Sequence, residues 1–264
     1  MKSIPEQIAA HLPGGEGVPD DIGKSGAQVI DYGDRFLKIQ AECNVSANEY
    51  HMLAWMQGRV PVPRIIAAAQ AEGQRWLLTS RMSGHYLCTA DLLEDQPRLA
   101  QLCAAALRTL WAVDVTSCPT KRTLEDKFRE IEEGLRGGWI TCEQAGDPTI
   151  YDVSAGGFAS PTALFDYLVK HCPEEELVLS HGDLCLPNIF ADENGLTGFI
   201  DVGWAGVADR WVDIEKCLWS MWANTTGVFG GKKRPFDRKL LFDALGMHPD
   251  EDRLRYYGLL DALC

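Results

Sequence analysis

The sequence contains no apolar run that approaches the roughly 20 residues of a membrane-spanning helix. Residues 1–6 also lack the apolar core of a signal peptide. The nine cysteines are scattered without any C-x-x-C pair, which argues against a disulfide framework and against a zinc site. We therefore expect a cytoplasmic protein with reduced thiols and no membrane contact.

Cationic residues are also scarce, since 25 Lys and Arg face 38 Asp and Glu, for a net charge of −13. Nucleic-acid binding depends on cationic surfaces, so this balance argues against nucleic-acid partners. An acidic surface permits a cationic ligand, although solubility alone also accounts for it. With 264 residues and 46% hydrophobic content, the chain can bury one large core or two modest lobes.

The residue pattern changes character near residues 82–84. Before this point it predicts strands over 29–32, 35–39 and 75–79 and one helix over 47–57, capped by Ser46 or Asn48. After it we expect helices over 99–112, 123–135, 163–171, 211–223, 239–245 and 250–263. The sequence predicts an α+β protein with a small strand-rich N-terminal lobe (residues 1–82) and a larger, mostly helical C-terminal lobe (residues 83–264).

The most informative motif is His-Gly-Asp-Leu-Cys-Leu-Pro-Asn at residues 181–188, followed thirteen positions later by Asp201. Phosphoryl transfer needs an acidic group beside the attacking hydroxyl, and Asp183 can provide it. It also needs oxygen ligands for magnesium, which Asn188 and Asp201 can provide. Strands over 189–191 and 196–200 form a predicted hairpin that would bring both ligands to one end. Taken singly, each residue is more typical of a turn than of a catalytic site, but their combination favours a catalytic site.

A nucleotide site is indicated upstream. Kinases use a strand lysine, paired with a helix glutamate, to contact the α- and β-phosphates. Lys38 lies in a predicted strand, and Glu49 in the predicted helix is its natural partner. Without the downstream motif, both would be read as exposed surface residues. The glycine-containing segment 23–27 precedes the lysine strand, where a phosphate-covering loop belongs, although it matches no standard phosphate-loop pattern.

These residues support a family resemblance. Residues 179–214, LSHGDLCLPNIFADENGLTGFIDVGWAGVADRWVDI, resemble the signature of aminoglycoside phosphotransferases, in particular the 3′-phosphotransferases that modify kanamycin and neomycin. Similar strings occur at residues 36–39, 48–49, 60–64, 76–78 and 257–261. The resemblance implies a bilobal protein-kinase-like fold. It also implies transfer of a phosphoryl group from ATP or GTP, with Mg²⁺, to an aminoglycoside hydroxyl, which we expect to be the 3′-hydroxyl, and hence antibiotic resistance.

By position, the resemblance assigns roles to individual residues. It implies that Asp183 is catalytic and that Asn188 and Asp201 bind magnesium. Nucleotide-binding roles are implied for Lys38, Glu49, Ser25, Phe36, Ser80, Met82, Phe190 and Ile200. Substrate contacts are implied for Asp261 and for the α-carboxylate of Cys264, and Asp147 and Asp152 are candidates in the poorly matching segment 141–158.

Four positions depart from the family pattern. Trp204 stands where the family usually has arginine, and Trp111 stands where a histidine is common. Ala262 replaces an acidic residue, and Cys264 replaces a terminal aromatic residue. The departures affect the acceptor-binding half of the site. We expect the substrate to be a polycationic aminoglycoside, and we expect this protein to accept a narrower range of aminoglycosides than its relatives do.

Other functions remain open at this stage. A kinase of another small hydroxylated molecule, such as a different antibiotic, a choline-like amine or a sugar, would use the same catalytic motif. A non-catalytic nucleotide-binding pseudokinase is disfavoured, because Asp183, Asn188 and Asp201 are all present. A protein kinase is disfavoured because no Ala-Pro-Glu activation segment is found. We expect a monomer.

Overall fold

A computed structural model describes residues 4–20, 26–144 and 148–263. Its N-terminal part is a five-stranded antiparallel sheet with the order β1-β2-β3-β5-β4. The strands are β1 (Val18–Asp20), β2 (Gln28–Asp31), β3 (Arg35–Ala41), β4 (Ile65–Ala71) and β5 (Gln74–Ser80). The three strands expected from the sequence are therefore confirmed to within a few residues.

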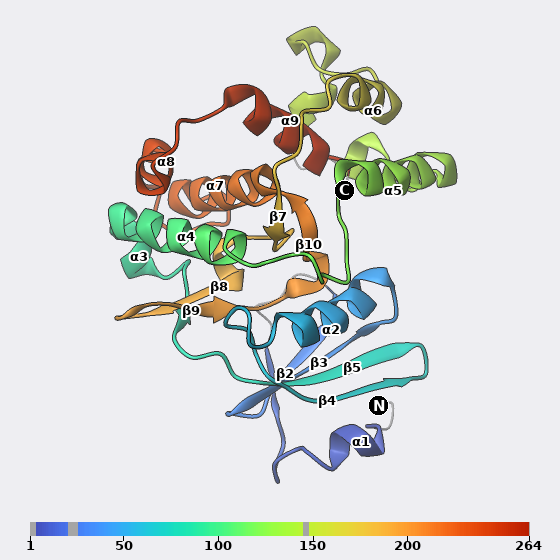
Figure 1. Cartoon of the computed structure of the whole chain (residues 1–264), viewed down its shortest axis with the longest axis vertical. Coiled ribbons are helices and arrows are strands. Elements are labelled where there is room, and N and C mark those ends of the chain that lie inside the picture. The colour runs from blue at the N-terminus through green and yellow to red at the C-terminus, as the bar shows by residue number, and fades with distance from the viewer. Residues whose placement is uncertain (1–3, 21–25, 145–147, 264) are drawn as a thin grey trace.

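Two helices cover opposite faces of this sheet (Figure 1). Side chains alternate along β3, so Leu37 and Ile39 point to one face, where they form a small core with Ile8 of helix α1 (Glu6–Ala9). Helix α2 (Asn44–Met56) lies against the other face. Its buried side chains belong to the large core of the C-terminal part rather than to the small one. The sheet thus separates two cores of unequal size.

The C-terminal part is mostly helical and surrounds the large core. Its helices are α3 (Ala90–Glu94), α4 (Gln96–Trp111), α5 (Leu124–Gly137), α6 (Pro161–Lys170), α7 (Arg210–Thr226), α8 (Lys239–Leu245) and α9 (Glu251–Asp261). Helix α4 is packed against both α7 and α8. Within the described ranges, no helix is both long enough and apolar enough to cross a membrane.

Short strands position the catalytic motif between these helices. β8 (Ile189–Asp192) and β9 (Gly195–Phe199) form the predicted hairpin, and β6 (His85–Tyr86) adds a third strand beside β8. β7 (Leu177–Ser180) pairs with β10 (Gly206–Asp209). The catalytic motif begins where β7 ends, and helix α7 begins where β10 ends.

The start of helix α2 differs from the expectation. The helix begins at Asn44, and its cap is Cys43, whose Sγ accepts a hydrogen bond from the Ser46 amide at 3.5 Å. Ser46 Oγ in turn accepts from the Cys43 amide at 2.9 Å. The prediction that Ser46 or Asn48 caps the helix was wrong, because both lie inside the first turns, where their side chains make other bonds.

Candidate active site

A buried carboxylate fixes the backbone at the start of the catalytic motif. Asp213, in helix α7, is fully buried and accepts hydrogen bonds from the main-chain amides of His181 (2.8 Å) and Gly182 (3.0 Å). Burial raises the pKa of Asp213, and the nearby His181 and the two amides oppose this rise. The backbone that leads into Asp183 is therefore held to α7 by two main-chain bonds.

Gly182 is required at the next position for two reasons. Its φ of +78° lies in the left-handed region, and a Cβ atom there would lie 2.2 Å from the main-chain oxygen of Trp204. Any side chain would push apart the catalytic loop and the segment that follows Asp201. This close approach brings the two halves of the motif together.

Asn188 joins the other end of the loop to the catalytic carboxylate. Its amide nitrogen donates to the Asp183 main-chain oxygen (2.9 Å) and to Asp183 Oδ2 (3.1 Å). Both partners are acceptors, which fixes the orientation of the amide and leaves the Asn188 amide oxygen for a cation. Ser220 Oγ of α7 holds the loop between them by accepting from the Leu186 amide at 3.0 Å.

The hairpin brings Asp201 to the same end as Asn188, as predicted. The Ile200 amide donates to the Asn188 main-chain oxygen at 3.0 Å. The buried His181 ring lies with Nε2 2.9 Å from the Ile200 main-chain oxygen, so it ties the catalytic loop to β9. Asp201 itself adopts a left-handed backbone with φ of 60°, a conformation that costs a non-glycine residue of order 1–3 kcal/mol. Such strain is typical of functional positions.

Lys38 connects the N-terminal sheet to this site. Its Nζ lies 2.9 Å from both carboxylate oxygens of Glu49 and 2.6 Å from Asp201 Oδ1. Burial opposes the charge on Lys38, but the Glu49 and Asp201 carboxylates outweigh it and raise the lysine pKa. Gln40 also donates to Glu49 at 2.7 Å. The expected ion pair of Lys38 with Glu49 is present, and Asp201 completes a three-residue charge cluster.

Helix α2 is fastened to the segment that follows Asp201. Asn48 donates to the main-chain oxygens of Gly203 (2.8 Å) and Ala205 (2.9 Å) and accepts from Thr120 Oγ1 (2.6 Å). A Cβ at Gly203 would lie 2.8 Å from a methyl group of Val45, so only glycine allows this contact. The helix that carries Glu49 is thereby placed directly against the loop that carries Asp201.

Cys185 lies within the motif but is not a nucleophile. Burial, followed by the charge of Asp183, raises the pKa of its thiol to about 12, and Asp201 contributes in the same direction. The thiol therefore stays protonated near neutral pH, where thiolate chemistry would need a lowered pKa.

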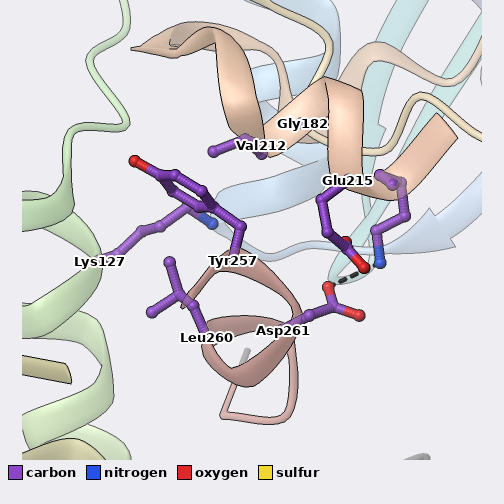
Figure 2. A pocket seen from close by; sticks show the side chains of 8 residues that line it. Lys127, Gly182, Val212, Glu215, Tyr257, Leu260 and Asp261 are labelled. Atoms are coloured by element: carbon purple, nitrogen blue, oxygen red, sulfur yellow. Dashed lines mark hydrogen bonds and ion pairs between the residues drawn. The ribbon is translucent and has the colours of Figure 1, made fainter. Parts of the chain in front are cut away.

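A small open pocket, with a cavity volume of about 20 Å³, lies beside the loop that carries Asp183, between α5, α7 and α9 (Figure 2). It is lined by Lys127, Gly182, Val212, Glu215, Lys216, Tyr257, Leu260 and Asp261. Gly182 directly precedes Asp183, and the charge of Asp183 acts on Lys216 in the pocket, so the pocket lies close to the Asp183 carboxylate. Within it, Lys216 Nζ lies 2.6 Å from Asp261 Oδ1. Figure 2 shows Glu215 and Asp261 extending into the same space from two helices.

Glu215 makes folding stability depend on pH. Its pKa is raised from 4.5 to about 7 by burial and then by the charge of Asp261, while Lys216 opposes the rise. A raised carboxyl pKa contributes stability that is complete below about pH 4.5 and is lost as the pH rises through about 7. Since the shift corresponds to at most about 3 kcal/mol and Glu215 is partly exposed to solvent, we expect a loss of ~1–2 kcal/mol.

The test is urea unfolding at several pH values between about 4.5 and 8. The free energy of unfolding of the wild type should fall relative to that of Glu215→Gln across this window. An unchanged difference between the two proteins throughout the window would contradict the raised pKa.

The proposed nucleotide residues lie in three places around Lys38. Phe36 and Lys38 lie on the same face of β3, and the Arg81 guanidinium lies 4.4 Å from the centre of the Phe36 ring. Ser80, at the end of β5, accepts from the Arg64 amide at 3.0 Å, and Met82 packs over Gly198 of β9. Phe190 and Ile200 are half-buried in the hairpin segment, where Phe190 contacts Tyr86 edge-on.

The residues proposed to contact the phosphate acceptor do not all lie at the pocket. Asp261 lines the pocket. Asp152 does not line it, and its carboxylate instead caps the turn Val153–Ala155 by accepting from the amides of Ser154 and Ala155. Ser25, Asp147 and Cys264 lie outside the described residues. Trp204 is exposed and packs its ring under Arg122 at 4.9 Å.

Several residues that build the site were not identified from the sequence. Asp213 and Ser220 hold the loop that carries Asp183 through main-chain bonds, and Asn48 holds the segment that follows Asp201 in the same way. The available signal was that Asp213 and Ser220 lie seven residues apart, on one face of the predicted helix 211–223, which is unusually polar for a face that points inward. Glu215 and Lys216, next to each other in the same helix, gave a similar signal.

Comparison with known proteins agrees with this geometry. The model of a phosphotransferase enzyme family matches residues 37–258. An aminoglycoside 3′-phosphotransferase from Staphylococcus aureus is 33% identical over 93% of this chain and 92% of its own. The crystal structure of an aminoglycoside-3′-phosphotransferase of type VIII superposes with a TM-score of 0.78 at 26% identity, covering 98% of both chains.

A less similar structure shows the fold alone. An aminoglycoside phosphotransferase from Streptomyces rimosus, in complex with ADP and streptomycin, superposes with a TM-score of 0.72 at 22% identity and covers 97% of this chain and 96% of its own. The predicted α+β, bilobal, kinase-like fold is confirmed by these superpositions.

Proposed function

Because this chain belongs to the phosphotransferase enzyme family, among the aminoglycoside phosphotransferases, we propose that it transfers a phosphoryl group from ATP or GTP to the 3′-hydroxyl of an aminoglycoside antibiotic and so confers resistance. One observation carries the proposal. The carboxylate of Asp183, the amide of Asn188 and the Lys38–Asp201 ion pair come together beside a pocket that carries the carboxyl groups of Glu215 and Asp261 as well as two lysines.

Asp183 acts on the acceptor. Its carboxylate accepts the proton of the attacking hydroxyl as the new oxygen–phosphorus bond forms and the bond from the γ-phosphorus to the diphosphate breaks. The bonds from Asn188 hold this carboxylate in place. Positioning and charge supply most of the rate enhancement in such a reaction, so a fixed loop matters more than a strong base.

The N-terminal lobe, residues 1–82, holds the nucleotide, and residues 83–264 supply the catalytic and acceptor groups. Lys38 binds the α- and β-phosphates, and Glu49 keeps its ammonium in position. Ser25 adds a hydroxyl in the phosphate loop. Five residues, Phe36, Ser80, Met82, Phe190 and Ile200, enclose the base of the nucleotide.

Asn188 and Asp201 would hold magnesium. The donor set fits, because a carboxylate and an amide oxygen are ligands that magnesium prefers. The Asn188 amide nitrogen is already bonded to Asp183, which leaves its oxygen for the ion. When bound, magnesium neutralises charge on the phosphates.

Asp201 should contribute more to magnesium binding than Asn188, because a carboxylate carries the charge that a divalent cation favours. We expect Asp201→Ala to weaken ADP binding in the presence of magnesium by about tenfold or more, and Asn188→Ala by less, since about 1.4 kcal/mol is a factor of ten. The measurement is calorimetric titration with ADP at several magnesium concentrations.

A titration without magnesium is the control, because Asp201→Ala also removes a partner of Lys38. The three proteins should differ least under that condition. Equal affinities of all three at saturating magnesium would contradict both ligand assignments.

The acceptor site recognises a polycation. Asp261 and Glu215 place acidic groups in the pocket, and the carboxylates of Asp147, Asp152 and Cys264 are further proposed contacts. Exposed ion pairs with single ammonium groups contribute about 0–1 kcal/mol each, so several must act together. We further propose that the enzyme works as a cytoplasmic monomer.

The direct test is turnover on a panel of kanamycin- and neomycin-like aminoglycosides, with ATP and GTP compared and the position of the phosphate determined by NMR. Transfer to the 3′-hydroxyl would support the proposal. Absence of transfer to every aminoglycoside, with transfer to a choline-like amine or a sugar, would overturn the proposed substrate but not the kinase activity.

A further inference from the structure

The acceptor pocket contains an ammonium group that belongs to the protein itself. Lys216 Nζ lies 2.6 Å from Asp261 Oδ1 and 5.7 Å from the centre of the Trp219 ring. The lysine side chain is 16% exposed, whereas that of Asp261 is 52% exposed. The lysine is thus the more enclosed partner, and the carboxylate faces the open part of the pocket (Figure 2).

The surroundings of this ammonium have the chemistry of a cation site. A carboxylate provides a charge-assisted hydrogen bond, and the face of an indole ring attracts a cation at this range of distance. Glu215 adds a second carboxyl group, whose charge interacts with both Asp261 and Lys216. A primary ammonium group of a ligand would find the same partners attractive.

The position of Lys216 connects this cation site to the reaction. It lies in α7 three residues after Asp213, which holds the catalytic loop, and the charge of Asp183 also acts on it. The pocket that it lines includes Gly182, which directly precedes Asp183. A cation bound here therefore lies on the acceptor side of the catalytic carboxylate.

We propose that Lys216 is a specificity-determining residue, whose ammonium occupies a cation subsite at Asp261 and must be displaced from that carboxylate by an ammonium group of the acceptor. The inference rests on the proposed function, because it needs a cationic acceptor. In consequence Asp261 gives such an acceptor less affinity than a free carboxylate would.

Exposed aromatic side chains next to the subsite give the displaced lysine somewhere to go. Trp219 is 42% exposed, and Phe229 contacts its ring edge-on at a centroid distance of 5.8 Å. Lys216 can leave Asp261 and still keep its cation–π contact with Trp219, so the displacement removes only part of its stabilisation. The subsite therefore discriminates among acceptors by weakening their binding rather than by excluding them.

The test is Lys216→Met, which keeps a flexible side chain of similar length and removes its charge. We expect the KM for a polycationic aminoglycoside to fall by about two- to tenfold, because the variant removes a partly exposed ion pair that competes with the acceptor for Asp261. The kcat and the KM for the nucleotide should stay unchanged, since the interaction acts equally on ground state and transition state. This decrease in the acceptor KM should be smaller at high salt, because salt screens exposed charges.

Two further variants separate the subsite from general effects. Lys232→Met removes another ion-paired lysine, 2.7 Å from Glu94 and outside the pocket, and should leave the acceptor KM unchanged. In an Asp261→Asn background, Lys216→Met should no longer lower the acceptor KM, because the shared carboxylate is gone.

The outcomes distinguish the two proposals. An acceptor KM that is unchanged or higher in Lys216→Met, with thermal stability and nucleotide KM as in the wild type, would overturn the role of Lys216 alone. A decrease in the acceptor KM that Lys216→Met still causes in the Asp261→Asn background would also overturn the role of Lys216. Failure of the wild type itself to phosphorylate any aminoglycoside would instead overturn the proposed function.

Discussion

Asp183→Asn will lower kcat by about 10²–10⁴-fold, the usual contribution of a positioned general base. Asparagine keeps the size of the side chain and the main-chain bond from Asn188, but it cannot accept the hydroxyl proton. ADP affinity should change little, because Lys38 and Asp201 contact each other rather than Asp183. The measurement is steady-state turnover together with ADP titration of the same preparation.

Asp252→Asn, on the exposed surface of α9, is a matched control that should retain full activity. A thermal melt shows whether Asp183→Asn is folded. Turnover of a folded Asp183→Asn variant within a few-fold of the wild type would be incompatible with a catalytic role for this carboxylate.

Asp213→Ala will destabilise the protein by about 2–5 kcal/mol. It leaves the buried His181 amide without an acceptor, which costs about 1–3 kcal/mol, and it removes a bond of similar strength to the Gly182 amide, which keeps only Ser180 Oγ as an acceptor. The desolvation of the buried carboxylate, which raises its pKa, offsets part of this loss. Urea unfolding should show a lower midpoint with an unchanged slope. The kcat should fall as well, because His181 and Gly182 lead directly into Asp183.

Asp213→Asn provides the graded comparison. It keeps one side-chain oxygen for the two amides, so its loss of stability should be intermediate between those of the wild type and Asp213→Ala. If both variants had the wild-type unfolding midpoint and kcat, the carboxylate would have no role in holding the loop.

The parts of the site that follow from short-range pattern could be predicted from the sequence. Asp183 and Asn188 are five residues apart in one loop, and the hairpin that brings Asp201 to Asn188 is read from two apolar runs around a turn. Helix α8 has the predicted bounds, Lys239–Leu245, since its apolar residues face one side over its whole length. Local periodicity and turn chemistry were sufficient in these cases.

Contacts between residues far apart in the chain could not be predicted in the same way. The bonds from His181 to Asp213 span 32 positions, and the ion pair of Lys216 with Asp261 spans 45. Local pattern indicates at most that a polar side chain faces inward, and it does not identify a partner far away in the chain. The cap of α2 was missed for another reason, because Cys43 is an uncommon capping residue whose sulfur takes the place of the usual oxygen.

The way in which α2 is fastened has a mechanical consequence. Asn48 binds the helix to the segment after Asp201, and its buried side chains share the large core, so α2 moves as part of the C-terminal body although it lies before residue 82 in the chain. Any rocking of the five-stranded sheet must then take place between the sheet and α2. The Lys38–Glu49 ion pair crosses that plane. The ion pair that we propose positions the nucleotide phosphates would therefore form or break according to whether the sheet and the C-terminal body lie close together.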